Sequence, residues 1–109
     1  MANNSWCFVQ DTTRPYFAVQ MLKENDHSVV PLTGATVAFY FRHVNETVAK
    51  VSAGSCNITD APNGKVEYRW TAGDLAVPGL YNAEFRITFA DTTIQSVIIR
   101  DVEVQERLL

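Results

Sequence analysis

Residues 64–87 read GKVEYRWTAGDLAVPGLYNAEFRI, two alternating runs of apolar and polar residues separated by a gap. Before a gap of small residues, Val66, Tyr68 and Trp70 share one parity, and polar residues occupy the other. The same alternation resumes at Tyr81, after the gap. Successive side chains of a strand point to opposite faces, so each run has one apolar face and one polar face. The pattern predicts two strands of an antiparallel sheet that is covered on one side only.

The gap between the two runs has the residues of a sharp corner. Pro78 fixes φ at about −65° and Gly79 accepts a positive φ, which fits the middle of a type II turn. Residues 71–74 begin with Thr and end with Asp, a variant of the capping box that predicts one turn of helix. Immunoglobulin-like domains carry, near the start of such a second strand, a tyrosine whose hydroxyl bonds back across the corner. We expect Pro78, Gly79 and Tyr81 to form this structural corner.

The rest of the chain reads as further short strands separated by turn residues, and no stretch has three turns of helical periodicity. About seven to nine strands with this spacing are typical of a β-sandwich. We therefore predict an all-β fold, an immunoglobulin-like antiparallel β-sandwich formed by a single domain over residues 1–109. The expected strands lie at residues 6–10, 16–23, 36–44, 47–53, 56–59, 66–70, 81–89 and 93–104, with a bend or edge piece at 29–35.

Local patterns refine this arrangement. Residues 16–23 carry apolar side chains on both faces, which favours a central strand. Residues 47–53 and 56–59 are weaker strand formers and favour edge positions. In residues 93–104 the apolar parity switches near the middle of the strand. A β-bulge within residues 99–101 would restore the register, because it inserts one extra residue on one side of a strand pair.

Five large apolar side chains lie on the apolar parities of their strands and are expected to form the core. Trp70 is also a candidate for the central aromatic side chain of an immunoglobulin sandwich. An antibody domain would carry a cysteine two residues after Tyr81, where this chain has Ala83. Cys7 and Cys56 fall elsewhere, so we expect both thiols to be free. The expected core residues are Phe39, Phe41, Trp70, Phe85 and Ile87.

Composition excludes several classes of partner. The chain has 109 residues and a formal net charge of −3, and its nine Lys and Arg residues are scattered. Binding to nucleic acid rewards clustered basic residues, so no nucleic-acid partner is expected. No apolar run approaches the roughly 20 residues of a membrane span, so no membrane partner is expected either. The N-terminal residues lack the basic start and apolar stretch of a signal peptide, which predicts a protein made in the cytoplasm.

Residues that carry chemistry are present, but not in the pattern of a catalytic or metal site. His27 adjoins Asp26 and Ser28, yet a nucleophilic triad requires groups that converge in space rather than neighbours in a loop. The acidic residues lie mostly at turns, and no loop holds the several acids of a calcium site. We predict a non-enzymatic protein with no catalytic, cofactor-binding or metal-binding residues.

Three segments resemble a known family. They are PLTGATVAFYF at residues 31–41, NGKVEYRWTAGD at 63–74 and PGLYNAEFRIT at 78–88. They are similar, in the same order, to the N-terminal domain of phage baseplate upper proteins and of related small phage virion proteins. The similarity extends from about Val9 to Val104. It implies a structural component of a phage virion, in the baseplate, tail, neck or head, that is assembled in the host cytoplasm.

The same resemblance implies that the partners are other virion proteins and that the chain forms a homo-oligomer or ring in the particle. Arg107, Leu108 and Leu109 follow the last expected strand. Two leucines in a terminal tail gain little unless a neighbour covers them, so we expect these three residues to bind a partner.

Two other functions remain open. Tyr40, Tyr68 and Trp6 are candidates for a sugar-stacking platform, so the leading alternative is a host-surface glycan-binding module. A third interpretation is a cytosolic or exported adaptor of no viral origin. A glycan binder should show exposed aromatic side chains beside amides and carboxylates. An assembly protein should instead show an apolar patch or a free sheet edge.

Overall fold

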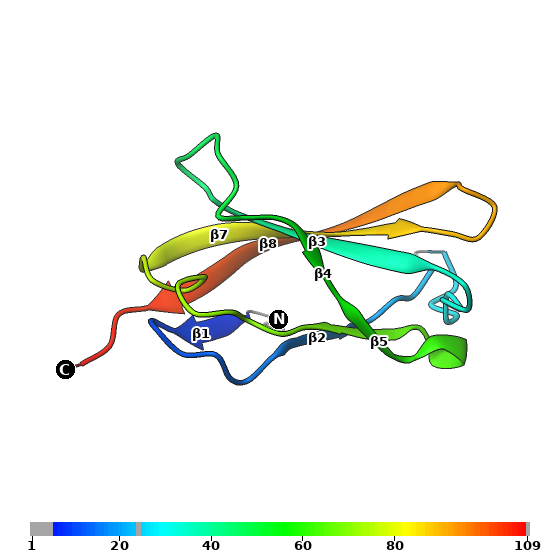
Figure 1. The fold of residues 1–109 in the computed structure, drawn as a ribbon, viewed down its shortest axis with the longest axis horizontal. Helices are drawn as coiled ribbons and strands as arrows, with labels where there is room; N and C mark the ends of the chain where they lie inside the picture. The colour runs from blue at the N-terminus through cyan, green and yellow to red at the C-terminus, as the bar shows by residue number, and fades with distance from the viewer. Residues whose placement is uncertain (1–5, 24, 109) are drawn as a thin grey trace.

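The computed structural model describes residues 6–23 and 25–108, which form two β-sheets packed face to face (Figure 1). One three-residue 3-10 turn, η1 (Ala61–Asn63), interrupts the described strands. The strands are β1 (Cys7–Val9), β2 (Phe17–Gln20), β3 (Thr36–His43), β4 (Val51–Ser55), β5 (Asn57–Asp60), β6 (Lys65–Tyr68), β7 (Gly79–Thr88) and β8 (Ile94–Gln105).

The order of these strands is that of an immunoglobulin-like sandwich. The larger sheet has the order β1-β8-β7-β3-β4 and the smaller one β2-β6-β5. The second, third, sixth and seventh strands thus occupy the places of strands B, C, E and F. All paired neighbours run antiparallel except β1 and β8, which are parallel. The predicted fold class is confirmed, with this one parallel pair added.

The prediction for residues 16–23 was wrong, whereas those for the two weak strands were confirmed. The strand β2 lies at an edge of the three-stranded sheet and pairs only with β6. The apolar residues of β2 and of the two positions after it divide between core and surface. Phe17 and Met21 are buried, whereas Ala18 and Leu22 are exposed. Apolar side chains on both faces therefore did not require a central position. Strands β4 and β5 both lie at sheet edges, as predicted.

A bulge in β8 lies where the sequence predicts it. Tyr81 pairs with Val102 and Ala83 pairs with Ile99, so Asn82 faces two residues of β8. Asp101, one of the two, has a φ of 61°. The extra residue switches the parity of β8, and this switch buries Val102 in the core.

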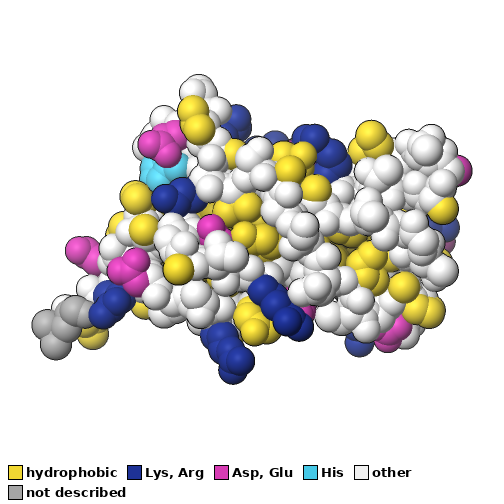
Figure 2. Space-filling model, in the orientation of Figure 1, with side chains coloured by type: hydrophobic (Ala, Val, Ile, Leu, Met, Phe, Trp, Pro, Cys, Tyr) yellow, Lys and Arg dark blue, Asp and Glu magenta, His cyan; other side chains and the backbone are white. Residues whose placement is uncertain are grey.

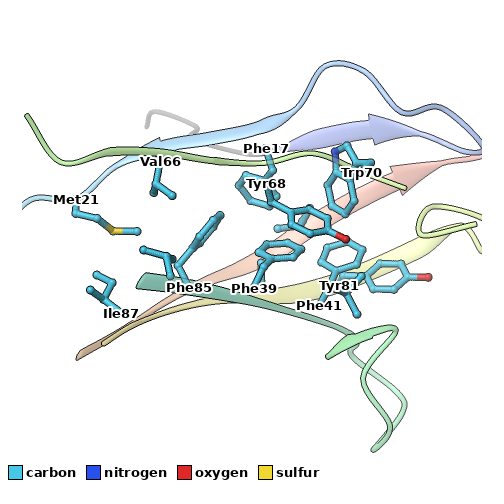
Figure 3. Packing of buried hydrophobic residues seen from close by; sticks show 14 of the residues in the cluster. Phe17, Met21, Phe39, Phe41, Val66, Tyr68, Trp70, Tyr81, Phe85 and Ile87 are labelled. Atoms are coloured by element: carbon cyan, nitrogen blue, oxygen red, sulfur yellow. The ribbon is translucent and has the colours of Figure 1, made fainter. Parts of the chain in front are cut away.

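The core is a cluster of aromatic side chains between the two sheets (Figure 3). Trp70, two residues beyond the end of β6, is 4% exposed and contacts Phe8 and Phe41 with ring centroids 5.0 Å apart. The Nε1–H of Trp70 is buried and has no acceptor among the described residues. The other four expected core residues are each fully buried: Phe39, Phe41, Phe85 and Ile87.

The corner forms by a different route from the predicted one. No helical turn occurs, and two successive turns take its place, closed by hydrogen bonds from Asp74 N to Thr71 O and from Ala76 N to Gly73 O. The residue with positive φ in the first turn is Gly73, at 92°. The Asp74 carboxylate stabilises this first turn. It accepts hydrogen bonds from Thr71 N, at 2.9 Å, and from the Tyr68 hydroxyl, at 2.7 Å.

Gly79 is not the middle of a turn but the first residue of β7, paired with Val104. Its φ is 141°, a value that L residues rarely adopt, and a Cβ there would meet the imidazole of His43. The neighbouring Tyr81 hydroxyl donates a hydrogen bond to Val77 O at 2.7 Å, as in the tyrosine corner of immunoglobulin-like domains.

The Gly79→Ala substitution should destabilise the fold by about 1–3 kcal/mol, the usual range for a strained backbone position. Gly73→Ala is the matched control, since its φ is also positive but a Cβ there meets nothing within 4 Å. Urea unfolding should show a larger loss for Gly79→Ala than for Gly73→Ala, and His43→Ala should reduce the difference. Equal losses of unfolding free energy for the two glycine variants would show that the contact with His43 does not contribute.

Phe85→Ala should cost about 3–5 kcal/mol, because it removes a fully buried ring from the centre of the core. Its neighbour Glu84 faces outward, and Glu84→Ala should cost less than about 1 kcal/mol, as for other partly exposed ion pairs. Chemical denaturation of both variants tests this order. A larger loss for Glu84→Ala would contradict the assignment of inward and outward faces.

Candidate functional site

The outer face of the larger sheet carries three cross-strand rows of side chains from β3, β7 and β8. The rows follow from the register of the two strand pairs. Side chains opposite one another on neighbouring strands lie close enough to interact. The first row is Arg42, Asn82 and Arg100, the second is Tyr40, Glu84 and Ile98, and the third is Ala38, Arg86 and Ser96.

The second and third rows are tied together by a polar network. The Arg86 guanidinium lies over the Tyr40 ring, 4.3 Å from its centroid, and donates a hydrogen bond to the Tyr40 hydroxyl. Its Nε lies 3.2 Å from Glu84 Oε2, and the Ser96 hydroxyl donates to the same oxygen at 2.7 Å. The hydrogen bond from Ser96, and then Arg86, lowers the pKa of Glu84. These contacts fix the side chains and pair the charges of Arg86 and Glu84.

The first row lacks such pairing. Within residues 6–23 and 25–108, neither Arg42 nor Arg100 forms an ion pair. Asn82 Oδ1 accepts a hydrogen bond from Asp101 N at 3.4 Å, and this uses the acceptor of the amide rather than its donors. The row therefore presents two guanidinium groups with an amide on the strand between them.

The first two rows line an open groove of about 280 Å³. The loop between β3 and β4 forms one wall, through Thr47 and Ala49, and Ile98 contributes apolar surface. Lys and Arg side chains are visible along the upper margin of the molecule, over the five-stranded sheet (Figure 2). We call this feature the arginine groove; it is lined by Tyr40, Arg42, Thr47, Ala49, Asn82, Ala83, Glu84, Ile98 and Arg100.

The expected partner-binding tail lies apart from this groove. Arg107 Nη1 is 3.6 Å from the Asp11 carboxylate, and Arg107 N donates to the Gln10 side chain at 3.2 Å. These contacts hold the tail against the segment that follows β1. Leu108 is 98% exposed, and Leu109 lies outside the described residues.

The three candidate sugar-stacking residues do not form one platform. Tyr68 is buried and donates its hydroxyl to Asp74, so it is unavailable as a stacking surface. Burial, assisted by Asp74, raises the pKa of its phenol. Trp6 packs against Phe17, with ring centroids 4.7 Å apart, and the Arg86 guanidinium covers a face of Tyr40.

Reasoning from the sequence did not identify Arg42, Asn82 and Arg100 as a group. Arg42 and Asn82 lie on polar parities, whereas Arg100 shares its parity with Ile98 and Val102. The predicted bulge was therefore the available signal for Arg100. The missing information was the pairing of β3 with β7, which are separated by more than 30 residues in the chain. The predicted corner residues lie beside this row, since Tyr81 pairs with His43, the residue after Arg42.

The described residues provide neither a metal site nor a membrane-spanning helix. They contain no group of three or more His, Cys, Asp or Glu side chains suited to holding a metal ion. They also contain no helix with the length and apolar character required to span a membrane. Cys7 is exposed and Cys56, the single residue between β4 and β5, is partly buried; neither is in a disulfide.

The two-sheet topology and the tyrosine corner define an immunoglobulin-like β-sandwich, and its arginine groove is an open surface rather than an enclosed pocket. Comparison with known families then identifies the particular module. The model of the BppU N-terminal domain matches residues 7–104, so the chain belongs to the family of the N-terminal domain of the phage baseplate upper protein. This family is that of a phage baseplate structural protein. No curated protein gives a significant match to the chain.

The two thiols should differ in reactivity. Burial raises the pKa of the Cys56 thiol to about 12, so little thiolate is present at pH 8. With Ellman's reagent, the native protein should release one equivalent from exposed Cys7 at least about tenfold faster than one from Cys56. The urea-unfolded, unreduced chain should give two equivalents. Finding none would indicate a disulfide and favour an exported protein.

Proposed function

We propose that this chain acts in the phage baseplate as a non-enzymatic assembly protein that binds other virion proteins through its surface. The membership in the baseplate family supports the location. The proposed binding to other virion proteins rests on a group of exposed apolar side chains at one end of the sandwich. This group, which we call the apolar end, consists of Val44, Val48, Val77, Leu80 and Leu108.

The apolar end gathers where β3 ends, β7 begins and the tail leaves β8. Val44 N donates a hydrogen bond to Leu80 O, which places these two residues side by side. Hydrophobic side chains are visible at this end of the molecule, near the start of β7 (Figures 1 and 2). Val48 is 76% exposed, far more than a core residue. Exposed apolar side chains at one end of a molecule suit a site that a protein partner covers.

The proposal includes association with further copies, as a homo-oligomer or ring within the particle. Strands β4, β2 and β5 each have one side without a neighbouring strand in the described chain. Such edges offer backbone donors and acceptors to a neighbour. The aromatic residues that suggested glycan binding do not support it, because Tyr68 is buried and the Arg86 guanidinium covers a face of Tyr40.

Deletion of residues 107–109 should leave the sandwich folded and reduce its incorporation into particles, since Leu108 belongs to the apolar end. Leu108→Ser is the matched control that keeps the contacts of Arg107 with Asp11 and Gln10. Mass spectrometry of purified particles should find the full-length chain in stoichiometric amounts and both variants reduced. If the full-length chain were absent from particles, the virion role would be wrong. Equal incorporation of all three chains would instead remove the role of the tail.

A further inference from the structure

The first row of the arginine groove has two cationic side chains without anionic partners in the described structure. The chain as a whole has a net charge of −3, whereas the three rows of this face hold three arginines and one glutamate, with Asp101 beside Arg100 in the bulge. Arg42, Arg86 and Arg100 contribute three positive charges, and Glu84 neutralises only Arg86. Two guanidinium charges on an otherwise acidic protein form a local field that attracts negatively charged partners.

The backbone brings Arg100 into this row. The bulge in β8 sets Arg100 and Asp101 opposite Asn82, and Asp101 adopts the positive φ that this requires. A non-glycine residue in this conformation carries a conformational cost. Bulges also change the direction of side chains beside binding sites. Here the bulge joins Arg100 to the row while it keeps Val102 in the core.

The chemistry of the row selects carboxylates. A guanidinium is planar and presents its N–H donors in a fork that matches the two oxygens of a carboxylate. Arg42 and Arg100 lie on either side of β7, about 10 Å apart by the usual spacing of two strands. The amide of Asn82 supplies a donor between them. Ile98 and Ala49 provide apolar surface beside the charges, which suits a protein segment better than an isolated small anion.

We propose that the arginine groove docks an acidic segment of a different virion protein, with carboxylates paired to Arg42 and Arg100. This inference rests on the proposed assembly function and specifies the chemistry of one of its contacts. A second copy of this chain is a poorer occupant. A two-fold contact of groove on groove would bring the two arginine rows together, and a ring contact would have to use the acidic residues of the same chain. In addition, several of the chain's own carboxylates are already engaged: Asp11, Asp26, Asp60, Glu67, Asp74, Glu84 and Asp91.

The first experiment measures incorporation. The double variant Arg42→Gln/Arg100→Gln should enter particles at least about tenfold less than the natural chain, as expected when buried carboxylates lose their partners. The matched control is Arg14→Gln/Arg69→Gln, which removes the same charge from two arginines that lie over the Tyr16 ring, outside the groove. It should enter within about twofold of the natural chain. Circular dichroism and thermal unfolding of the purified chains should show both variants folded.

The second experiment identifies the occupant. Arg42→Lys/Arg100→Lys keeps both charges and introduces primary amines, which a carbodiimide couples to carboxylates in direct contact. Treatment of purified particles, followed by mass spectrometry, should find amide links from positions 42 and 100 to Asp or Glu of another virion protein. The corresponding Arg14→Lys/Arg69→Lys chain should give no such links from positions 14 and 69.

The outcomes separate the two proposals. Absence of the natural chain from particles overturns the assembly function and with it the docking contact. Presence of the natural chain, with unchanged incorporation of Arg42→Gln/Arg100→Gln or no amide links from the groove, overturns the docking contact alone. Links from positions 42 and 100 to a second copy of this chain would show that the occupant is wrong.

Discussion

The structure depends on the aromatic contacts of Phe39, which join the two sheets. Its ring lies 4.3 Å from that of Tyr68 and 5.6 Å from those of Phe17 and Trp70, measured between centroids. Phe39 lies in β3 of the larger sheet, whereas Phe17 and Tyr68 lie in β2 and β6 of the smaller sheet. In antibody domains a disulfide links the sheets near this position, whereas this chain has Ala83 where that cysteine would stand. Stacked and edge-to-face rings therefore provide the connection between the layers, through area burial and ring electrostatics.

Much of the fold follows from the sequence because side-chain parity is a local property. The alternation of residues 64–87 defines which side chains of β6 and β7 face inward, whatever the neighbouring strands are. The bulge in β8 was predictable for the same reason, since an uncorrected register would have exposed Val102. The position of β2 was not predictable from parity, because an edge strand can leave apolar side chains such as Ala18 exposed. Its place depends on which strands pair, and pairing is a long-range property.

The corner shows why local turn chemistry can mislead. Pro-Gly is a strong signal for a type II turn, yet Gly79 is required here at the start of a strand beside His43. The hydrogen bonds of Asp74 decide the turn instead, and they depend on Tyr68, a residue of the preceding strand. The candidate site was still less accessible to sequence reasoning. Arg42, Asn82 and Arg100 become neighbours only through the pairing of β7 with β3 and β8. In the sequence the two arginines are far apart and form no visible cluster.

The parallel pairing of β1 with β8 has a mechanical consequence. The N-terminal strand and the C-terminal strand run in the same direction, with Cys7, Phe8 and Val9 opposite Glu103, Val104 and Gln105. Hydrogen bonds from Glu103 N to Trp6 O and from Gln10 N to Gln105 O extend this contact at both ends. A force that pulls the two ends of the chain apart loads all these bonds in shear, so they must break together rather than one after another. The short pairing of β1 with β8 at the edge of the larger sheet therefore determines the resistance of the chain to extension.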